Sequence, residues 1–247
     1  MTTPRRVAIV TGASSGIGRA TALHLARRDW TVVIVGRRAS HLSALTSEIK
    51  AAGGSVIAIT ADLTKPRDVT RIIDEAKSAG GRIDALLNIA GVGGMHTIMT
   101  DDASMQLILD TNVVAPIRLM RAVIPIMRAQ HSGTIVNVGS VMGEIAIGGL
   151  YSATKFAIRA LTYSVRRELK GTGIHVALVE PGYIATEMTV EHKGRMPGPE
   201  IVAAAIESCL NRDRHKVVVP GSYRFLILLA NIAPWVVNRM YNGKIDA

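Results

Sequence analysis

The sequence has little cysteine and is short of acidic residues. Cys209 is the single cysteine, so the 247 residues permit neither an internal disulfide nor a cysteine metal cluster. A reducing, cytoplasmic setting is the simplest expectation. Lys and Arg number 29 against 19 Asp and Glu, giving a formal net charge of +10. Residues 1–47 hold seven Arg and one Asp, and such a basic block suits nucleic acid, a membrane surface or a phosphorylated cofactor, unless it is merely solvated.

Long hydrophobic runs are also missing. The apolar run that begins at Val7 breaks into glycine at Gly12, so we expect no secretory segment. The strongest apolar stretch elsewhere, residues 225–237, is interrupted by Asn231 and Pro234 and is too short to span a bilayer. No group of His or Cys has metal-ligand spacing, so we expect no metal site.

What the sequence does contain is a repeated alternation of short apolar runs and amphipathic stretches. The runs are rich in β-branched residues and show no polar alternation, which is typical of strands buried on both faces. Seven strands are predicted, at residues 7–10, 31–35, 56–59, 85–89, 134–138, 175–179 and 216–219. Helical patterns lie between most of them. We therefore predict an α/β fold, with one doubly wound domain over residues 1–247 and helices on both faces of a parallel sheet.

The first predicted strand is followed by a glycine turn, TGASSGIG at residues 11–18, and then by a helical pattern. Glycine lets the backbone approach a pyrophosphate, and a helix N-terminus offers unpaired N–H groups to it. The spacing is G-x-x-x-G-x-G, and its place between a strand and a helix favours dinucleotide binding. The expected cofactor contacts are Gly12, Ser14, Ser15, Gly16, Ile17 and Gly18.

Two arginines, Arg37 and Arg38, follow the second predicted strand. A carboxylate at this place usually binds the ribose hydroxyls of NAD and would repel a 2′-phosphate. Each charge-assisted hydrogen bond from a guanidinium to that phosphate contributes about 1.5–3 kcal/mol. The pair therefore predicts NADP(H) rather than NAD(H), unless both side chains point into solvent.

The next two strand ends carry further candidate contacts. Asp62 and Leu63 follow the third strand, where the acid can accept the adenine amino group, although a helix N-cap explains an Asp there equally well. Asn88, Ala90 and Gly91 close the fourth strand. Their small size lets a loop lie against the ribose, and an ordinary turn would look similar.

Tyr151 and Lys155 stand four residues apart, with Ser140 upstream. On a helix this spacing places the phenol and the ammonium on one face. A phenol must shift its pKa by about three units to work near neutral pH, and a cation about 4 Å away supplies roughly that much. Taken alone, however, the pair is no more than a common helix surface pair.

The helical pattern at residues 102–130 contains an irregularity at Pro116. Proline lacks an N–H, so the carbonyl of Asn112 loses its helical partner and the helix bends. A freed carbonyl can hold a water molecule, and a proline kink without any role is the alternative.

Together these motifs resemble the short-chain dehydrogenase/reductase family over roughly residues 5–220. They occur in the family's order: TGASSGIG at 11–18, Asp62, NIAG at 88–91, Asn112, Ser140, Tyr151-x-x-x-Lys155 and PGYIAT at 181–186. Each motif is weak evidence alone, but chance is a poor explanation for seven motifs in the family's order. The resemblance implies a Rossmann-like fold of strand order 3-2-1-4-5-6-7.

The resemblance also implies residue roles. Tyr151 would be the general acid/base, Lys155 would lower its pKa and hold the ribose, and Ser140 would orient the substrate oxygen. Asn112 would hold a water through its main-chain carbonyl, linking Lys155 to solvent. Pro181, Gly182, Ile184 and Thr186 would position the nicotinamide. Hydride would pass between the nicotinamide and a carbonyl carbon.

Three departures from the family pattern stand out. Ile89 replaces a frequent second Asn, and Gly139 replaces a frequent second Ser. The separation between Ser140 and Tyr151 is also about two residues shorter than usual, which bears on the shape of the substrate loop.

Substrate and partners follow from the last third of the chain. Residues 187–211 predict a lid-like substrate region. Residues 222–241 form an apolar helical face of Phe225, Leu228, Leu229, Ile232, Trp235, Val236 and Met240. It can cap the pocket, pack on a second subunit or lie on a membrane; burial in the protein is our first expectation, and peripheral membrane contact the lesser one.

We expect an apolar carbonyl or alcohol substrate, such as a steroid-like or lipid-derived one, and a homo-oligomer, either dimer or tetramer. Nucleic acid is not an expected partner, because the basic residues cluster where cofactor phosphates would lie. A non-catalytic NADP(H)-binding sensor or scaffold of the same fold is the alternative function.

Overall fold

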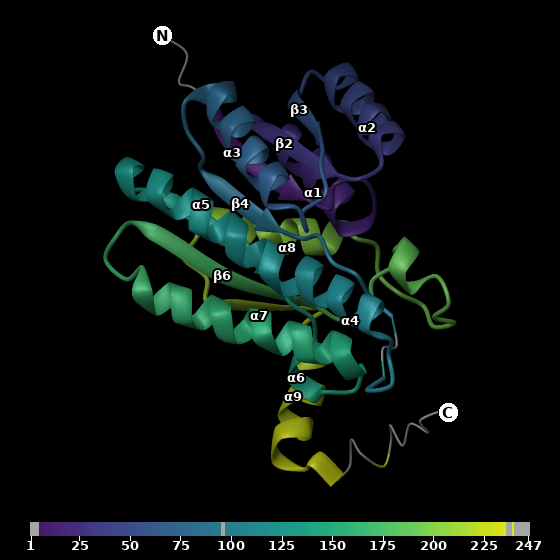
Figure 1. The fold of residues 1–247 in the computed structure, drawn as a ribbon. Coiled ribbons are helices and arrows are strands. Elements are labelled where there is room, and N and C mark those ends of the chain that lie inside the picture. The colour runs from purple at the N-terminus through teal and green to yellow at the C-terminus, as the bar shows by residue number, and fades with distance from the viewer. Residues whose placement is uncertain (1–4, 95–96, 236–238, 240–247) are drawn as a thin grey trace.

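Seven parallel strands form the sheet, in the order β3-β2-β1-β4-β5-β6-β7 (Figure 1). The structure is a computed structural model that describes residues 5–94, 97–235 and 239. The strands are β1 (Arg6–Thr11), β2 (Trp30–Gly36), β3 (Ser55–Thr60), β4 (Ala85–Asn88), β5 (Gly133–Val138), β6 (Ile174–Pro181) and β7 (Lys216–Val219). The predicted fold class and strand order are confirmed.

Both faces of the sheet are buried, which explains why the strands lack polar alternation. Ala8 and Val10 of β1 point into one hydrophobic core, and Val7 and Ile9 point into the other. The helices are α1 (Gly16–Ala26), α2 (Ala39–Ala51), α3 (Pro66–Gly80), α4 (Asp102–Leu109), α5 (Ala115–Gln130), α6 (Met142–Ile145), α7 (Gly149–Glu168), α8 (Glu200–Asn211) and α9 (Tyr223–Ile232). α1, α2 and α8 cover the first core, while α3, α5 and α7 lie on the opposite face (Figure 1).

The irregularity predicted near Pro116 is present but has a different form. A π-helical turn, η1 (Asp110–Val114), separates α4 from α5, and Asn112 lies within it. Pro116 occupies the first turn of α5, where its missing N–H is tolerated. The expected proline kink is thus a π turn, which inserts one extra residue into the helix.

The C-terminal helix α9 has an apolar side toward the protein and another toward solvent. Its inner side chains, Tyr223, Leu226, Ile227 and Ala230, pack on Val141, Ile145 and Val218. The outward side chains of Phe225, Leu228, Ile232 and Trp235 are exposed. Within the single chain these four side chains are not buried, and Leu229 is partly buried. Packing of this face on a second subunit stays a prediction, and Val236 and Met240 lie outside the described residues. Within the described part of the chain, no helix is both long and apolar enough to cross a membrane.

Candidate functional site

The glycine turn brings the start of α1 close to the ends of β1 and β4. Gly12 adopts a positive φ of 69°, and a Cβ on it would lie 2.8 Å from Cα of Ala90. A Cβ on Gly18 would lie 2.3 Å from the carbonyl oxygen of Gly12. No larger residue fits at either position without a shift of the backbone. The turn therefore leaves a cradle at the N-terminus of α1 that is suited to phosphate.

A cleft of about 510 Å³ opens above this cradle, along the carboxyl ends of the strands. Its lining includes most of the predicted cofactor contacts: Gly12, Ser14, Ser15, Gly16, Ile17, Gly18, Arg37, Arg38, Asp62, Leu63, Ala90, Gly91 and Thr186. In an open α/β sheet, ligands bind at this edge where the strand order reverses, here between β1 and β4. The cradle and the cleft both fit a dinucleotide.

Arg38 lies at one end of the cleft and is held by two partners. Its Nε and Nη2 donate to Oγ of Ser14 at 3.3 and 3.2 Å, and its Nη1 donates to Glu187 Oε2 at 2.8 Å. Glu187 belongs to η2 (Glu187–Thr189), the start of the predicted lid. Sequence reasoning missed this acid as a site residue, because only the fold brings residue 187 to residue 38.

A second lid residue reaches the other wall of the cleft. A Cβ on Gly93 would lie 2.5 Å from Sδ of Met188, so the thioether lies directly across the loop that follows β4. Behind it, the lid is closed by a hydrogen bond from the Ala185 N–H to the Pro197 carbonyl at 2.9 Å. The segment after Thr186 therefore crosses the cleft as a structured loop.

Asp62 lines the cleft and forms a turn of its own. Its Oδ1 accepts hydrogen bonds from the N–H and Oγ1 of Thr64 at 3.1 and 2.8 Å. Burial raises the pKa of Asp62, but these hydrogen bonds, together with Lys65 and Arg37, outweigh it, so the pKa is lowered. The N-cap alternative is not realised, because the N-cap of α3 is Lys65.

At the end of β4, Asn88 turns away from the cleft. Its Nδ2 donates to Oδ1 of Asn137 at 2.8 Å, and the side chain is buried between strands. The loop beyond it is shaped by Thr11, whose Oγ1 accepts from the N–H groups of Ile89 and Ala90 at 2.9 and 3.1 Å. Thr11 is thus a structural residue of the site that sequence reasoning did not single out.

The structure brings Ser140, Tyr151 and Lys155 together. Ser140 lies just after β5, Tyr151 is in the first turn of α7, and Lys155 is one turn further along. A hydrogen bond joins Ser140 to Tyr151, and Lys155 Nζ lies 5.6 Å from the centre of the Tyr151 ring. Lys155 Nζ also donates to the Val138 carbonyl at 3.0 Å.

Burial is the main influence on the pKa of both groups in this trio. It raises the pKa of the Tyr151 phenol, and the hydrogen bond with Ser140 acts in the opposite direction. Burial lowers the pKa of Lys155 to about 8, which leaves the ammonium mostly protonated at neutral pH. The lowering effect of the Ser140 hydrogen bond on the Tyr151 pKa is smaller than the raising effect of burial. That Lys155 lowers the pKa of Tyr151 remains a prediction.

Asn112 and Gly91 connect the trio to the cleft. A Cβ on Gly91 would lie 3.3 Å from Oδ1 of Asn112 and 3.5 Å from Nζ of Lys155. The Asn112 side chain accepts from the Val92 N–H at 2.8 Å and donates to the Val92 carbonyl and to Oγ1 of Thr154 at 2.9 and 3.1 Å. The π turn therefore fixes the loop after β4 against α7. The predicted water on its main-chain carbonyl remains a prediction.

The loop after Ser140 is tied to the sheet by a buried ionic network. Glu144 on α6 pairs with Lys216 of β7 and with Arg159 of α7, the latter at 2.8 Å. Lys216 Nζ also lies 2.9 Å from Oε2 of Glu180 on β6. Lys216 is thus paired with the carboxylates of both Glu144 and Glu180. Glu180 is fully buried, and desolvation together with Glu144 raises its pKa to about 7 despite Lys216.

This network accounts for the departure at Gly139. A Cβ at that position would lie 3.2 Å from Cγ of Glu180 and 3.1 Å from Cδ1 of Leu178. A serine there would press on the buried carboxylate. Gly139 and Glu180 are therefore sterically matched.

The turn after β6 supports the same region. Gly182 lies under the ring of Tyr223, since a Cβ on it would come within 2.2 Å of that ring. Pro181 accepts a hydrogen bond from the Val141 N–H at 2.9 Å, and Ile184 is buried in the core. Only Thr186 of the four predicted nicotinamide contacts lines the cleft, and a Cβ on Gly16 would lie 3.1 Å from it.

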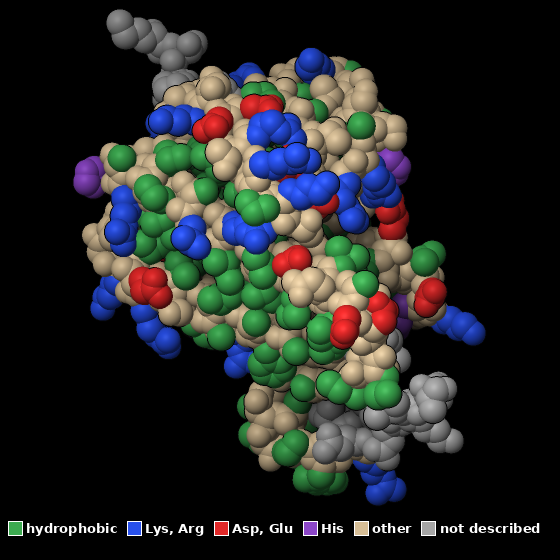
Figure 2. All heavy atoms as spheres, viewed as in Figure 1, with side chains coloured by type: hydrophobic (Ala, Val, Ile, Leu, Met, Phe, Trp, Pro, Cys, Tyr) green, Lys and Arg blue, Asp and Glu red, His purple; other side chains and the backbone are tan. Residues whose placement is uncertain are grey.

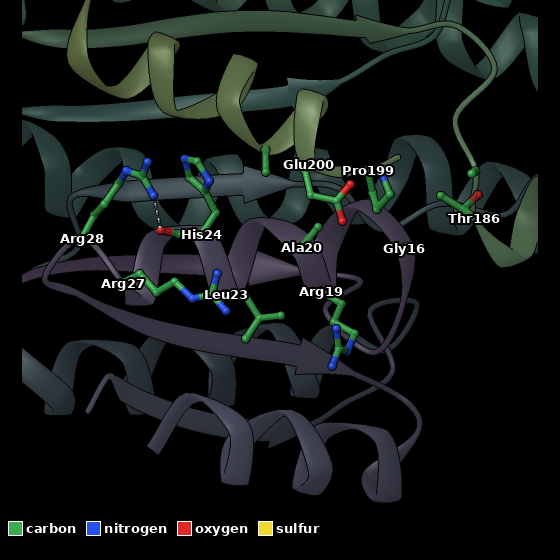
Figure 3. Close-up of a pocket in the computed structure, with 12 residues that line it drawn as sticks. Gly16, Arg19, Ala20, Leu23, His24, Arg27, Arg28, Thr186, Pro199 and Glu200 are labelled. Atoms are coloured by element: carbon green, nitrogen blue, oxygen red, sulfur yellow. Dashed lines mark hydrogen bonds between the residues drawn. The ribbon is translucent and has the colours of Figure 1, made fainter. Parts of the chain in front are cut away.

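A second groove, of about 390 Å³, lies between α1 and α8 (Figure 3). Arg19, His24, Arg27 and Arg28 line it, and Arg28 donates to the His24 carbonyl at 3.2 Å. His24 and Arg28 are each held at 2.7 Å by Glu207. Tyr151 and Lys155 line neither this groove nor the first cleft, but Gly91, which lines the first cleft, lies next to Lys155 Nζ, so the trio adjoins the first cleft.

Comparison with known sequences gives a consistent result. A family model described as short chain dehydrogenase matches residues 6–196. A protein named ketoacyl reductase HetN from Nostoc sp. is 33% identical over 259 residues, covering 98% of this chain and 90% of its own length. A 3-oxoacyl-[acyl-carrier-protein] reductase from Synechocystis sp. is 37% identical over 188 residues, covering 74% of this chain and 76% of its own.

Solved structures agree with the sequence matches. A metagenomic short-chain oxidoreductase in complex with NADP superposes with a TM-score of 0.77 at 32% identity, covering 87% of this chain and 96% of the other. A short-chain dehydrogenase/reductase from Burkholderia phymatum, in complex with NAD, gives a TM-score of 0.88 at 23% identity, covering 95% of each chain. The second likeness concerns the fold alone.

Proposed function

We propose a function from one premise, that this chain belongs to the short-chain dehydrogenase/reductase family and is an oxidoreductase with a nicotinamide cofactor. The proposed reaction is hydride transfer between NADP(H) and a carbonyl compound or secondary alcohol. The observation that carries the proposal is the Ser140–Tyr151 hydrogen bond with the Lys155 ammonium beside it, next to Gly91 of the dinucleotide cleft.

Tyr151, Ser140 and Lys155 would each have a separate role in the reaction. Bound NADP(H) would supply or accept the hydride. Tyr151 would give a proton to, or take one from, the substrate oxygen, and Ser140 would donate a hydrogen bond to the charge that develops there. Lys155 is charged at neutral pH and lies near the Tyr151 ring, so it would stabilise the phenolate.

The preference for NADP(H) over NAD(H) rests on Arg37 and Arg38. Both line the cleft at the end of β2, and Arg38 is already placed there by Ser14. A 2′-phosphate would find two guanidiniums and no carboxylate on β2 itself. The relative of known structure whose complex contains NADP is consistent with this preference.

We further propose an apolar carbonyl or alcohol substrate, such as a lipid-derived one. Val141, Ile145 and Ile147 follow Ser140, make the adjoining loop apolar and pack in a small core with α9. Two relatives are named for the reduction of ketoacyl compounds, which are lipid-derived carbonyls. We also propose that the protein is cytoplasmic and forms a homo-oligomer. The exposed side chains of Leu107 and Leu109 on α4 and of Phe156 on α7 would suit a subunit interface.

The experiment is to follow NADPH absorbance with a panel of hydrophobic ketones, and NADP⁺ reduction with the matching alcohols. Tyr151→Phe should abolish turnover and leave NADPH binding nearly intact. Tyr163→Phe, the same substitution further along α7, is the matched control and should keep full turnover. Turnover in the Tyr151 variant would contradict the assignment, and NADPH binding without turnover of any substrate by the parent chain would favour a non-catalytic sensor.

A further inference from the structure

The exposed side of α9 and the residues just beyond its end at Ile232 carry a row of apolar side chains, the stripe. Phe225, Leu228, Ile232 and Trp235 follow one another at spacings of three, four and three residues, and they are between 56% and 72% exposed. Figure 2 shows hydrophobic side chains gathered over this end of the molecule. An apolar stripe of this kind needs a partner surface. We infer that α9 docks the protein on an anionic membrane surface, with this stripe in the headgroup layer.

The charges around the stripe favour an anionic membrane surface as its partner. Arg224 is exposed beside Phe225, and Arg239 is exposed beyond Trp235. The sequence contains no acidic residue between Asp213 and Asp246. Apolar side chains flanked by arginines and ending in a tryptophan are the composition of an interfacial helix. Anionic headgroups would attract both arginines.

The same charges disfavour a second copy of this chain as the partner. A twofold contact through the stripe would place identical surfaces against each other. Arg224 and Arg239 of one copy would then face a surface with the same positive charges and no carboxylate from residues 214–245. Like charges across an interface oppose association. An anionic lipid surface would attract these arginines instead of repelling them.

The inner side of α9 connects this surface to the proposed active site. Tyr223 covers Gly182, and its hydroxyl accepts a hydrogen bond from the Tyr183 N–H at 3.4 Å. Val141 and Ile145, which follow Ser140, pack on the same side. A docked α9 would therefore hold the Ser140 loop next to the bilayer, where apolar substrates dissolve. This delivery step rests on the proposed function, whereas the docking step does not.

Tryptophan fluorescence of the unaltered chain provides the first test. Trp30 is only 3% exposed and Trp235 is 70% exposed, so a change on adding vesicles reports on Trp235. Vesicles of phosphatidylcholine mixed with phosphatidylglycerol should shift the emission to shorter wavelength. Vesicles of phosphatidylcholine alone should shift it much less, and added salt should weaken the response. Absence of any shift with the anionic vesicles would overturn the proposal.

Co-sedimentation with the same vesicles tests the stripe itself. Phe225→Ser combined with Ile232→Ser should weaken binding by at least tenfold, because two large apolar side chains are lost from the interface. Arg224→Gln should weaken it about fivefold on anionic vesicles only. Ile98→Ser, at another exposed apolar residue that lies before α4 and outside the stripe, is the matched control and should bind as the parent does.

Activity and mass in solution separate the remaining outcomes. Turnover of a water-soluble carbonyl should be unchanged in the Phe225/Ile232 variant, while turnover of a carbonyl carried in anionic vesicles should fall with binding. Equal vesicle binding by parent and variant would overturn the proposal. A parent oligomer that the variant dissociates, with no vesicle binding by the parent, would also overturn it and would assign the stripe to a second copy. Failure of turnover in both assays with intact vesicle binding would contradict only the proposed function.

Discussion

Glu187 should compete with the cofactor for Arg38, and Glu187→Gln should therefore strengthen NADPH binding. The carboxylate of Glu187 accepts a hydrogen bond from Nη1 of Arg38 at 2.8 Å across the mouth of the cleft. A 2′-phosphate that binds Arg38 must share or replace this partner. Removing the negative charge of Glu187 frees the guanidinium and also removes an anion from the neighbourhood of the phosphate.

The magnitude follows from exposure. The Arg38 and Glu187 side chains are 39% and 60% exposed, so their ion pair is strongly screened by water. An exposed pair of this kind contributes about 0.2–1 kcal/mol, which corresponds to a gain of roughly 1.5- to 5-fold in NADPH affinity. Arg38→Ala removes the phosphate partner itself, and the loss of about 1.5–3 kcal/mol is roughly a 10- to 150-fold loss in NADPH affinity.

The assay is the dissociation constant of each variant for NADPH and for NADH, followed by kcat/KM with both once a substrate is known. NADH lacks the 2′-phosphate, so its affinity should change little in either variant. Arg71→Ala is the matched control, because Arg71 is a similarly exposed arginine paired with Glu75 outside the cleft. Weaker NADPH binding by Glu187→Gln, or equal losses for NADPH and NADH in Arg38→Ala, would refute the competition.

Three further variants test other parts of the site. Asn112→Ala should lower the free energy of unfolding in urea by about 2–4 kcal/mol, because the Val92 N–H and carbonyl lose their partner. Ser140→Ala should lower kcat about 100-fold and leave NADPH affinity unchanged, since the hydroxyl would act on charge that develops during the reaction. Between pH 4.5 and 7 the folded state holds a proton on Glu180 that the unfolded state has released, so the stability of the parent should fall as pH rises through this range by the order of 3 kcal/mol. Glu180→Gln should abolish that fall, and an unchanged slope would contradict the raised pKa.

The sheet was predictable because its determinants are local. A parallel sheet with two covered faces needs continuous apolar strands, and each predicted strand lies within two residues of the observed one at either end. The glycine turn was predictable for the same reason, because Gly12 and Gly18 meet a steric demand that is set within a few residues.

Features that depend on long-range contacts were not predictable. The pairing of Arg38 with Glu187 joins residues 149 positions apart, and that of Lys216 with Glu144 joins residues 72 apart. Neither acid lies in a pattern that distinguishes it from an ordinary surface carboxylate. The exposure of Phe225 and its neighbours escaped prediction for a related reason, since apolar spacing shows which residues share a face and not what that face meets.

The extra residue of the π turn sets the two halves of the long helix out of phase. An α-helix advances about 100° per residue, so α4 and α5 present faces that a continuous helix could not present together. Deleting one residue within 110–114 would bring the halves back into phase and rotate the Asn112 amide away from Val92 and Thr154. The helix would become more regular. The loop after β4 would lose the hydrogen bonds by which the Asn112 amide joins Val92 to Thr154 of α7.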